Sequence, residues 1–123
     1  MSRRIMLGVA ALTVFTTIAL AGFANASSGA QSTHAITKTV KIIKMSNGNY
    51  TYSPKSITVK VGTTIIWNNT TGTDHSVNTS NVKFGINDIP PHHKAKLTFK
   101  NVGTVKYHCA FHSYMHGVVK VVK

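Results

Sequence analysis

Residues 103–122, GTVKYHCAFHSYMHGVVKVV, contain two stretches of alternating apolar residues, separated by a short segment rich in histidine. The apolar positions are Val105, Tyr107 and Cys109 before the segment, and Val119 and Val121 after it. Alternation with period two places every second side chain on one face of a β-strand. We therefore predict a strand that ends at Cys109, a tight loop, and a second strand that starts near Val118.

The same alternation recurs upstream at Val40 and Ile42, at Ile57, Val59 and Val61, and at Ala95, Leu97 and Phe99. Pro54, Pro90 and Pro91 fall between these runs, where no strand donor is needed. The stretch from Trp67 to Asn81 lacks a clean period, so we predict a loop around a short strand that carries His75. The pattern favours an all-β, antiparallel two-sheet sandwich with Greek-key connections and about 7 or 8 strands.

The N-terminal residues have the features of an export signal. A positive start (Met1 to Arg4) and an apolar stretch (Ile5 to Gly22) precede the small residues of Ala24-Asn25-Ala26. We predict a signal over residues 1–26, a flexible leader over 27–35 and a folded domain over 36–123. An uncleaved membrane anchor is the alternative, because the apolar run approaches the roughly 18 to 20 residues that span a bilayer.

The chain carries 14 Lys and Arg residues against 2 Asp and Glu residues, a net charge of +12. Without residues 1–26, 12 lysines face only Asp74 and Asp88, which leaves +10. Two distant aspartates exclude chemistry that needs paired carboxylates, such as that of glycosidases and aspartic proteases. The lysines are not interleaved with aromatic residues, so we expect no nucleic-acid partner. We expect partners with acidic docking faces, or peripheral association with an anionic membrane.

Cys109 is the only cysteine, which is unusual for an exported protein unless the thiol has a role. A buried structural thiol is one reading. However, Cys109, His112 and Met115 are spaced by three, and a tight loop can turn them toward one point. His75 lies 34 residues upstream (109 − 75), far enough to belong to a neighbouring strand.

Two imidazoles, a thiolate and a weak axial thioether are the ligand set of a blue copper site. Zinc is the competing metal. Structural zinc sites usually take four strong nitrogen or sulfur ligands and seldom a thioether, so Met115 favours copper.

At these residues the sequence resembles the cupredoxins, and within them the amicyanin and plastocyanin group. The Cys-x-x-His-x-x-Met loop is similar to the short amicyanin version. The resemblance extends upstream over Tyr52-Ser53-Pro54, over Val59 to Thr63, and over Trp67 and Asn69. It implies a cupredoxin-like Greek-key β-sandwich with one type 1 copper per chain, and it places the ligands at His75, Cys109, His112 and Met115.

The resemblance also implies a function. The protein would be a monomer without enzymatic activity, exported to the periplasm or the extracytoplasmic face of the cell membrane. It would shuttle single electrons between a redox donor and an acceptor protein. The exit would be the exposed edge of His112, flanked by Phe111 and Tyr114. At Ser76 the family more often has an Asn that ties the two ligand loops together.

Two other functions are compatible with the sequence. A copper carrier or buffer in the same compartment would deliver the ion instead of cycling it. A copper-dependent enzyme would need an open coordination position or a second metal.

The remaining histidines, and the aromatic residues Trp67 and Tyr107, are not expected to bind the copper. His108 alternates with Cys109, so its side chain should point to the opposite face of the strand. His92 and His93 follow two prolines in a loop and should be solvated. Alternatively, they could form a second, exposed site for a divalent metal, with or without His116. We expect Trp67 and Tyr107 in the core and His34 in the leader.

Overall fold

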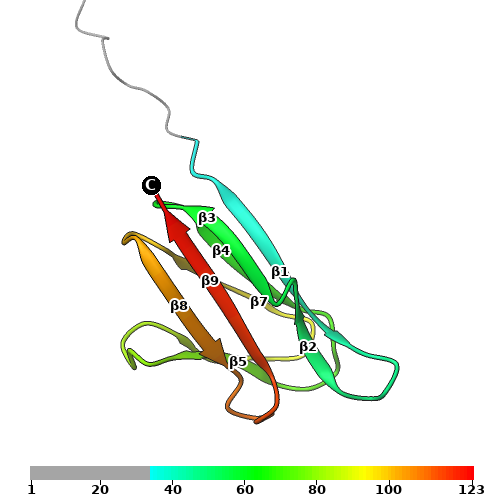
Figure 1. Ribbon diagram of the computed structural model, residues 1–123. Coiled ribbons are helices and arrows are strands. Elements are labelled where there is room, and N and C mark those ends of the chain that lie inside the picture. The colour runs from blue at the N-terminus through cyan, green and yellow to red at the C-terminus, as the bar shows by residue number, and fades with distance from the viewer. Residues whose placement is uncertain (1–33) are drawn as a thin grey trace, which may run out of the picture. The chain divides into compact units, whose positions relative to one another are not determined.

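Alternating apolar residues form nine β-strands in the computed structural model, which describes residues 34–123 (Figure 1). The strands are β1 (Thr37–Lys44), β2 (Tyr50–Ser53), β3 (Ser56–Lys60), β4 (Thr64–Asn69), β5 (His75–Thr79), β6 (Ile86–Ile89), β7 (Lys94–Thr98), β8 (Gly103–His108) and β9 (His116–Val122). Within these residues, no helix is long and apolar enough to cross a membrane. The signal predicted for residues 1–26, and the predicted leader up to residue 33, lie outside the described residues.

The strands form two sheets, with the orders β2-β1-β4-β7 and β3-β9-β8-β5-β6. β1 runs parallel to β4, and β3 runs parallel to β9. The expectation of a purely antiparallel protein is therefore wrong, and both sheets are mixed. Period two reports that a side chain faces the core but not which way its neighbouring strand runs, so the alternation could not predict these two pairs.

The expected loop over Trp67 to Asn81 is also wrong in part, because Trp67 to Asn69 belong to β4. Ile65, Trp67 and Asn69 are fully buried and alternate with partly exposed residues. The polar Asn69 masks the period. Its burial is tolerated because Nδ2 donates to the carbonyl oxygens of Thr73 (2.8 Å) and Ile89 (2.9 Å). His75 begins β5, as predicted.

Two further details differ from the expected pattern. The predicted inward position at Val61 lies past the end of β3, and its side chain is 44% exposed. Gly62 turns the chain there with a φ of 90°, a conformation that glycine adopts readily. Residues 34–123 contain nine strands, more than the 7 or 8 expected. The strands β2 and β6 have four residues each and are too short to show a clear period in the sequence.

The core lies between the sheets and includes Trp67 and Tyr107, as expected. Tyr107 contacts the rings of Tyr52 and Trp67 edge-on, with centroid distances of 4.7 and 5.5 Å. Its ring also covers Gly117, its partner on β9. Beyond this pair, β8 and β9 are joined by the loop 109–115 at one end of the sheets (Figure 1). The histidine-rich segment is therefore anchored on both sides by core strands.

Candidate metal centre

Three side chains from two segments converge at the end of β8. His75 begins β5, Cys109 follows β8, and His112 lies in the loop that leads to β9. The Sγ atom of Cys109 is 3.8 Å from Nδ1 of His75 and 3.6 Å from Nδ1 of His112. One possible ligand atom from each residue lies within 4.8 Å of the others.

These separations suit a single metal ion. An ion bonded to sulfur at about 2.3 Å and to nitrogen at about 2.0 Å in trigonal geometry holds the two atoms about 3.7 Å apart. Both measured S···N distances lie within 0.1 Å or so of that value. Both S···N distances therefore fit one thiolate and two imidazoles bound to the same ion.

Met115 is positioned by the backbone of the loop. Its amide donates to the carbonyl oxygen of His112 at 2.9 Å, and its own carbonyl oxygen accepts from the amide of Cys109 at 3.0 Å. These two bonds close the loop, in which the Sγ atom of Cys109 and Nδ1 of His112, three residues apart, lie 3.6 Å from each other. The Met115 side chain is 1% exposed, so its thioether is kept inside the domain.

The four side chains of the site differ in their exposure to solvent. His75, Cys109 and Met115 are buried, whereas His112 is half-buried. No other group of three or more His, Cys, Asp or Glu residues in positions 34–123 brings its ligand atoms this close. Among the described residues, His92, His93 and His116 do not form such a three-residue group.

A polar chain behind His75 fixes the protonation of its ring. Nδ1 faces the sulfur, so the proton of the neutral ring belongs on Nε2. Nε2 then donates to Oγ1 of Thr71 at 2.9 Å, and the Thr71 hydroxyl donates to Oδ1 of Asn69 at 2.8 Å. Such a partner orients a metal-binding imidazole and raises its basicity as a ligand.

The protein environment keeps His75 neutral. Burial, together with the neighbouring His112, lowers the pKa of His75 to about 4, although Asp74 opposes this shift. A neutral imidazole has a free lone pair at Nδ1. His75 is thus ready to bind a metal at pH values well below neutrality.

Ser76 ties the two ligand-bearing segments together. Its Oγ accepts a hydrogen bond from the Ala110 amide at 2.8 Å and lies 3.8 Å from Sγ of Cys109. Ser76 therefore forms the link between the ligand loops that the resemblance led us to expect from an Asn. Its hydroxyl also donates to Oδ1 of Asn78 at 2.5 Å.

Two tyrosines of β2 wall the site. The ring of Tyr50 packs against both imidazoles, with centroids 4.9 Å from His75 and 4.8 Å from His112. The hydroxyl of Tyr52 donates to the Ser76 carbonyl oxygen at 2.5 Å. Burial, and secondarily the negative charge of the Cys109 thiolate, raises the pKa of Tyr52, so this hydroxyl stays protonated and remains a donor.

Sequence reasoning missed three of these supporting residues: Thr71, Asn78 and Tyr50. Asn78 had a usable signal, because it lies two residues after Ser76 and therefore on the same face of β5. Thr71 and Tyr50 reach the site from a loop and from another strand, and no local spacing marks them.

The donor set fits copper. Thiolate and thioether sulfur suit Cu(I), imidazole suits both oxidation states, and no carboxylate belongs to the cluster. His75, Cys109, His112 and Met115 form a type 1 copper-like site on an all-β sandwich.

Comparisons with known proteins agree with this class. A family model described as a cupredoxin-like domain matches residues 9–121, and the chain belongs to the cupredoxins. A search of curated proteins finds no significant match. The predicted fold and the predicted cofactor are therefore confirmed.

Several solved structures are similar to this chain. The Cu(I) form of an amicyanin mutant and the oxidised form of another are each 32% identical, with TM-scores of 0.61, and the alignments cover 72% of this chain and 82% of theirs. A purple cupredoxin from Nitrosopumilus maritimus is 25% identical, with a TM-score of 0.57 and coverage of 68% and 98%.

A copper-containing nitrite reductase from Thermus scotoductus is also similar. It is 24% identical, with a TM-score of 0.61, and the alignment covers 72% of this chain but only 23% of the reductase. This likeness concerns the fold alone.

Proposed function

We propose that the chain is an exported type 1 blue copper protein that shuttles single electrons between redox proteins, with His75, Cys109, His112 and Met115 as the copper ligands. The observation that carries this proposal is the convergence of one sulfur and two imidazole nitrogens within 4.8 Å. When bound, copper supplies a one-electron Cu(II)/Cu(I) couple. The protein holds the ligands in place and provides the path for electrons to the surface.

The first task of the protein is to hold the ligands still. Electron transfer is fast when the ligands move little between oxidation states. Thr71 fixes the ring of His75, and Ser76 fastens the amide after Cys109 to β5. Backbone bonds close the loop from Cys109 to Met115. These contacts favour one ligand geometry for both oxidation states.

The second task is to give electrons a path to the surface. His112 is the least buried of the four residues. Phe111 and Tyr114, which flank it in the loop, are 53% and 46% exposed. An apolar rim around an imidazole edge lets a partner approach closely and exclude water. We assign the exit to this edge of His112.

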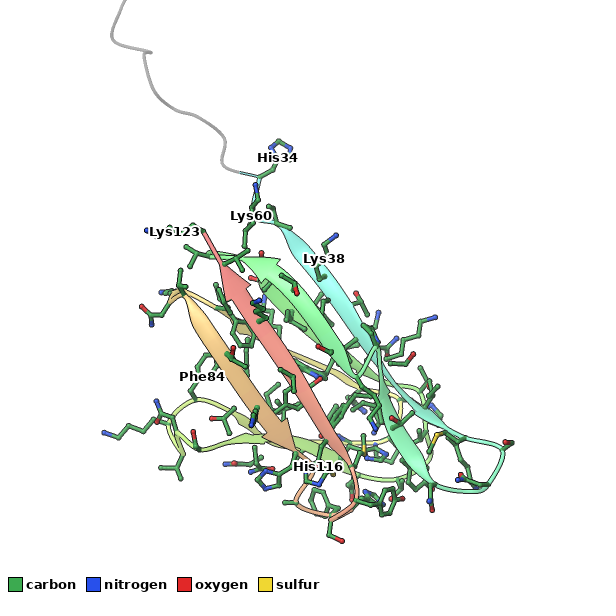
Figure 2. The ribbon with its side chains drawn as sticks, in the orientation of Figure 1. His34, Lys38, Lys60, Phe84, His116 and Lys123 are labelled. Atoms are coloured by element: carbon green, nitrogen blue, oxygen red, sulfur yellow. The ribbon has the colours of Figure 1, made fainter. Side chains whose placement is uncertain are left out.

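The burial of the other three side chains supports a role without catalysis, because a substrate would have no direct access to them. A groove of about 350 Å³ lies elsewhere, beside β8. Phe84, labelled in Figure 2, lines it together with Phe99 and Lys106. None of the four proposed ligands lines this groove.

The charge of the domain supports a class of partner. All 12 lysines lie in the described part of the chain, against Asp74 and Asp88. A charge near +10 favours encounter with acidic docking faces on a donor and an acceptor, or with an anionic membrane surface. We propose a monomer in the periplasm or at the extracytoplasmic face of the membrane, since residues 1–26 have the pattern of an export signal.

Stopped-flow oxidation of the Cu(I) protein by ferricyanide tests this function. The oxidant is anionic and reacts without binding the metal, so we expect fast second-order oxidation that slows as salt is added. Phe111→Glu should slow the reaction more than the control variant Val82→Glu, which adds the same charge. Val82 is 91% exposed and follows the C-terminal end of β5, whereas His75 lies at the N-terminal end of that strand. Equal slowing by the two variants would contradict an exit at His112. Rapid loss of copper to a chelator would favour a carrier instead.

A further inference from the structure

Two exposed histidines lie opposite each other on neighbouring strands. His108 ends β8 and His116 begins β9, and the antiparallel register pairs them directly. Their ring centroids are 6.4 Å apart, with an interplanar angle of 46°. Figure 2 labels His116 where β9 leaves the ligand loop. Both side chains lie on the solvent face, as the alternation of His108 with Cys109 predicted.

This spacing suits two imidazoles that share one ion. A ring nitrogen binds a first-row metal at about 2.0 Å, which puts the ring centroid about 3.2 Å from the ion. Two such rings have centroids between about 4.5 and 6.4 Å apart, depending on the angle at the metal. The observed separation equals the upper limit, at which the two nitrogens lie on opposite sides of the ion, so the rings must turn toward each other to hold an ion at a smaller angle.

The surroundings leave both rings available. Within residues 34–123, neither imidazole forms a hydrogen bond to the protein. Asn78 pairs with His108 from the other side, on β5, but its Oδ1 already accepts a hydrogen bond from the Ser76 hydroxyl. Lys106, two residues before His108, is exposed as well and disfavours cations by charge. A ligand of this site must therefore gain its affinity from direct bonds to nitrogen.

We propose that His108 and His116 form a second metal site, on the surface, for a divalent late first-row ion, with water completing its coordination. Two neutral imidazoles favour Cu²⁺, Ni²⁺ and Zn²⁺ over Ca²⁺ and Mg²⁺, and Cu²⁺ should bind most tightly. The site faces away from the copper centre, because His108 and Cys109 project from opposite faces. It does not depend on the proposed electron transfer.

Binding at this pair should also stabilise the copper loop. The next pairing toward the loop is the hydrogen bond from Cys109 N to Met115 O. An ion bridging His108 and His116 would clamp β8 to β9 at the base of the segment that contains three of the four ligands. Because the unfolded chain does not hold these two rings together, the ion binds the folded state preferentially and raises the melting temperature.

Calorimetric titration with Ni²⁺ tests the proposal on protein whose copper site is filled with Cu(I). We expect one Ni²⁺ per chain and a rise in melting temperature with added Ni²⁺. His108→Gln and His116→Gln should each weaken binding at least tenfold and remove the thermal shift. His92→Gln, His93→Gln and His34→Gln are the matched controls and should bind as the unaltered protein does.

Electron paramagnetic resonance supplies a second readout. One equivalent of Cu²⁺ added to the reduced protein should give an axial signal with coupling to two nitrogens, and His116→Gln should remove it. The proposal is overturned if Ni²⁺ does not bind, if His116→Gln leaves the affinity unchanged, or if a control variant abolishes binding. The visible band of the oxidised copper centre is recorded separately, so its absence would count against the proposed function and not against this site.

Discussion

The Oγ atom of Ser76 lies 3.8 Å from the Sγ atom of Cys109, within reach of donating a hydrogen bond to it. A hydroxyl carries one proton, and two acceptors compete for it. Oδ1 of Asn78 is only 2.5 Å from the Ser76 Oγ atom, so the hydroxyl donates its proton to this oxygen and not to the more distant sulfur. Ser76 thus positions the Cys109 loop through the Ala110 amide without donating a hydrogen bond to the thiolate.

Asn78→Ala should raise the reduction potential of the copper site. Without Asn78, the Ser76 hydroxyl is free to donate to the thiolate, which weakens electron donation by sulfur and disfavours the oxidised state. A hydrogen bond worth about 1 kcal/mol corresponds to about 40 mV for a one-electron couple. Voltammetry measures the shift.

The control for that prediction is the double variant Ser76→Ala with Asn78→Ala, which lacks the donor and should not show the increase. An unchanged or lowered potential in Asn78→Ala alone would refute the assignment of the Ser76 proton.

Thr71→Val should weaken copper binding by about 10- to 100-fold, because His75 loses the acceptor that fixes its ring. The buried Nε2–H would be left without a partner, which costs about 1 to 3 kcal/mol of folding free energy. Thr71→Ser keeps the hydroxyl and should behave almost normally. Competition with a copper chelator gives the affinity, and equal affinities for the two variants would argue against the role of Thr71.

The stability of the copper-free protein should fall as the pH drops from about 6.5 toward 4. The pKa of His75 is lowered to about 4 by burial and by His112, so in this window the unfolded chain binds a proton that the folded chain excludes. The loss has a slope of up to about 1.4 kcal/mol per pH unit. Urea denaturation across this range measures it. His75→Gln should have a flatter profile, and an equally steep one would assign the effect to other groups.

Gly117→Ala should destabilise the domain by about 1 to 3 kcal/mol, because an added Cβ would lie 2.2 Å from Cζ of Tyr107. Thermal unfolding measures the loss. In a Tyr107→Leu background the same change should cost less, and this non-additivity separates a clash from a loss of backbone freedom. Additive effects would contradict direct contact between the two positions.

The local parts of this structure could be predicted from the sequence. Cys109, His112 and Met115 occupy one short loop between two alternating strands, so spacing alone brings them together. His75 is distant in the chain, and its assignment depended on the resemblance to the cupredoxins. Trp67 and Tyr107 were predicted in the core because large aromatic side chains are usually buried.

Contacts between segments that are distant in the chain could not be predicted from the sequence. The parallel pairing of β1 with β4 leaves no trace in the period of either strand. Thr71 and Asn78 act through side-chain hydrogen bonds to neighbouring residues, which no motif records. In the sequence alone, His116 is a candidate partner of His92 and His93. Only the register of β8 and β9 shows that its partner is His108.

The central claim is that Cys109 binds copper as a thiolate together with two imidazoles. The visible absorption spectrum of the protein loaded with Cu(II) tests it most directly. We predict a strong thiolate-to-copper band that is absent in Cys109→Ser. A colourless protein that holds zinc tightly, or a band that survives in Cys109→Ser, would contradict the account.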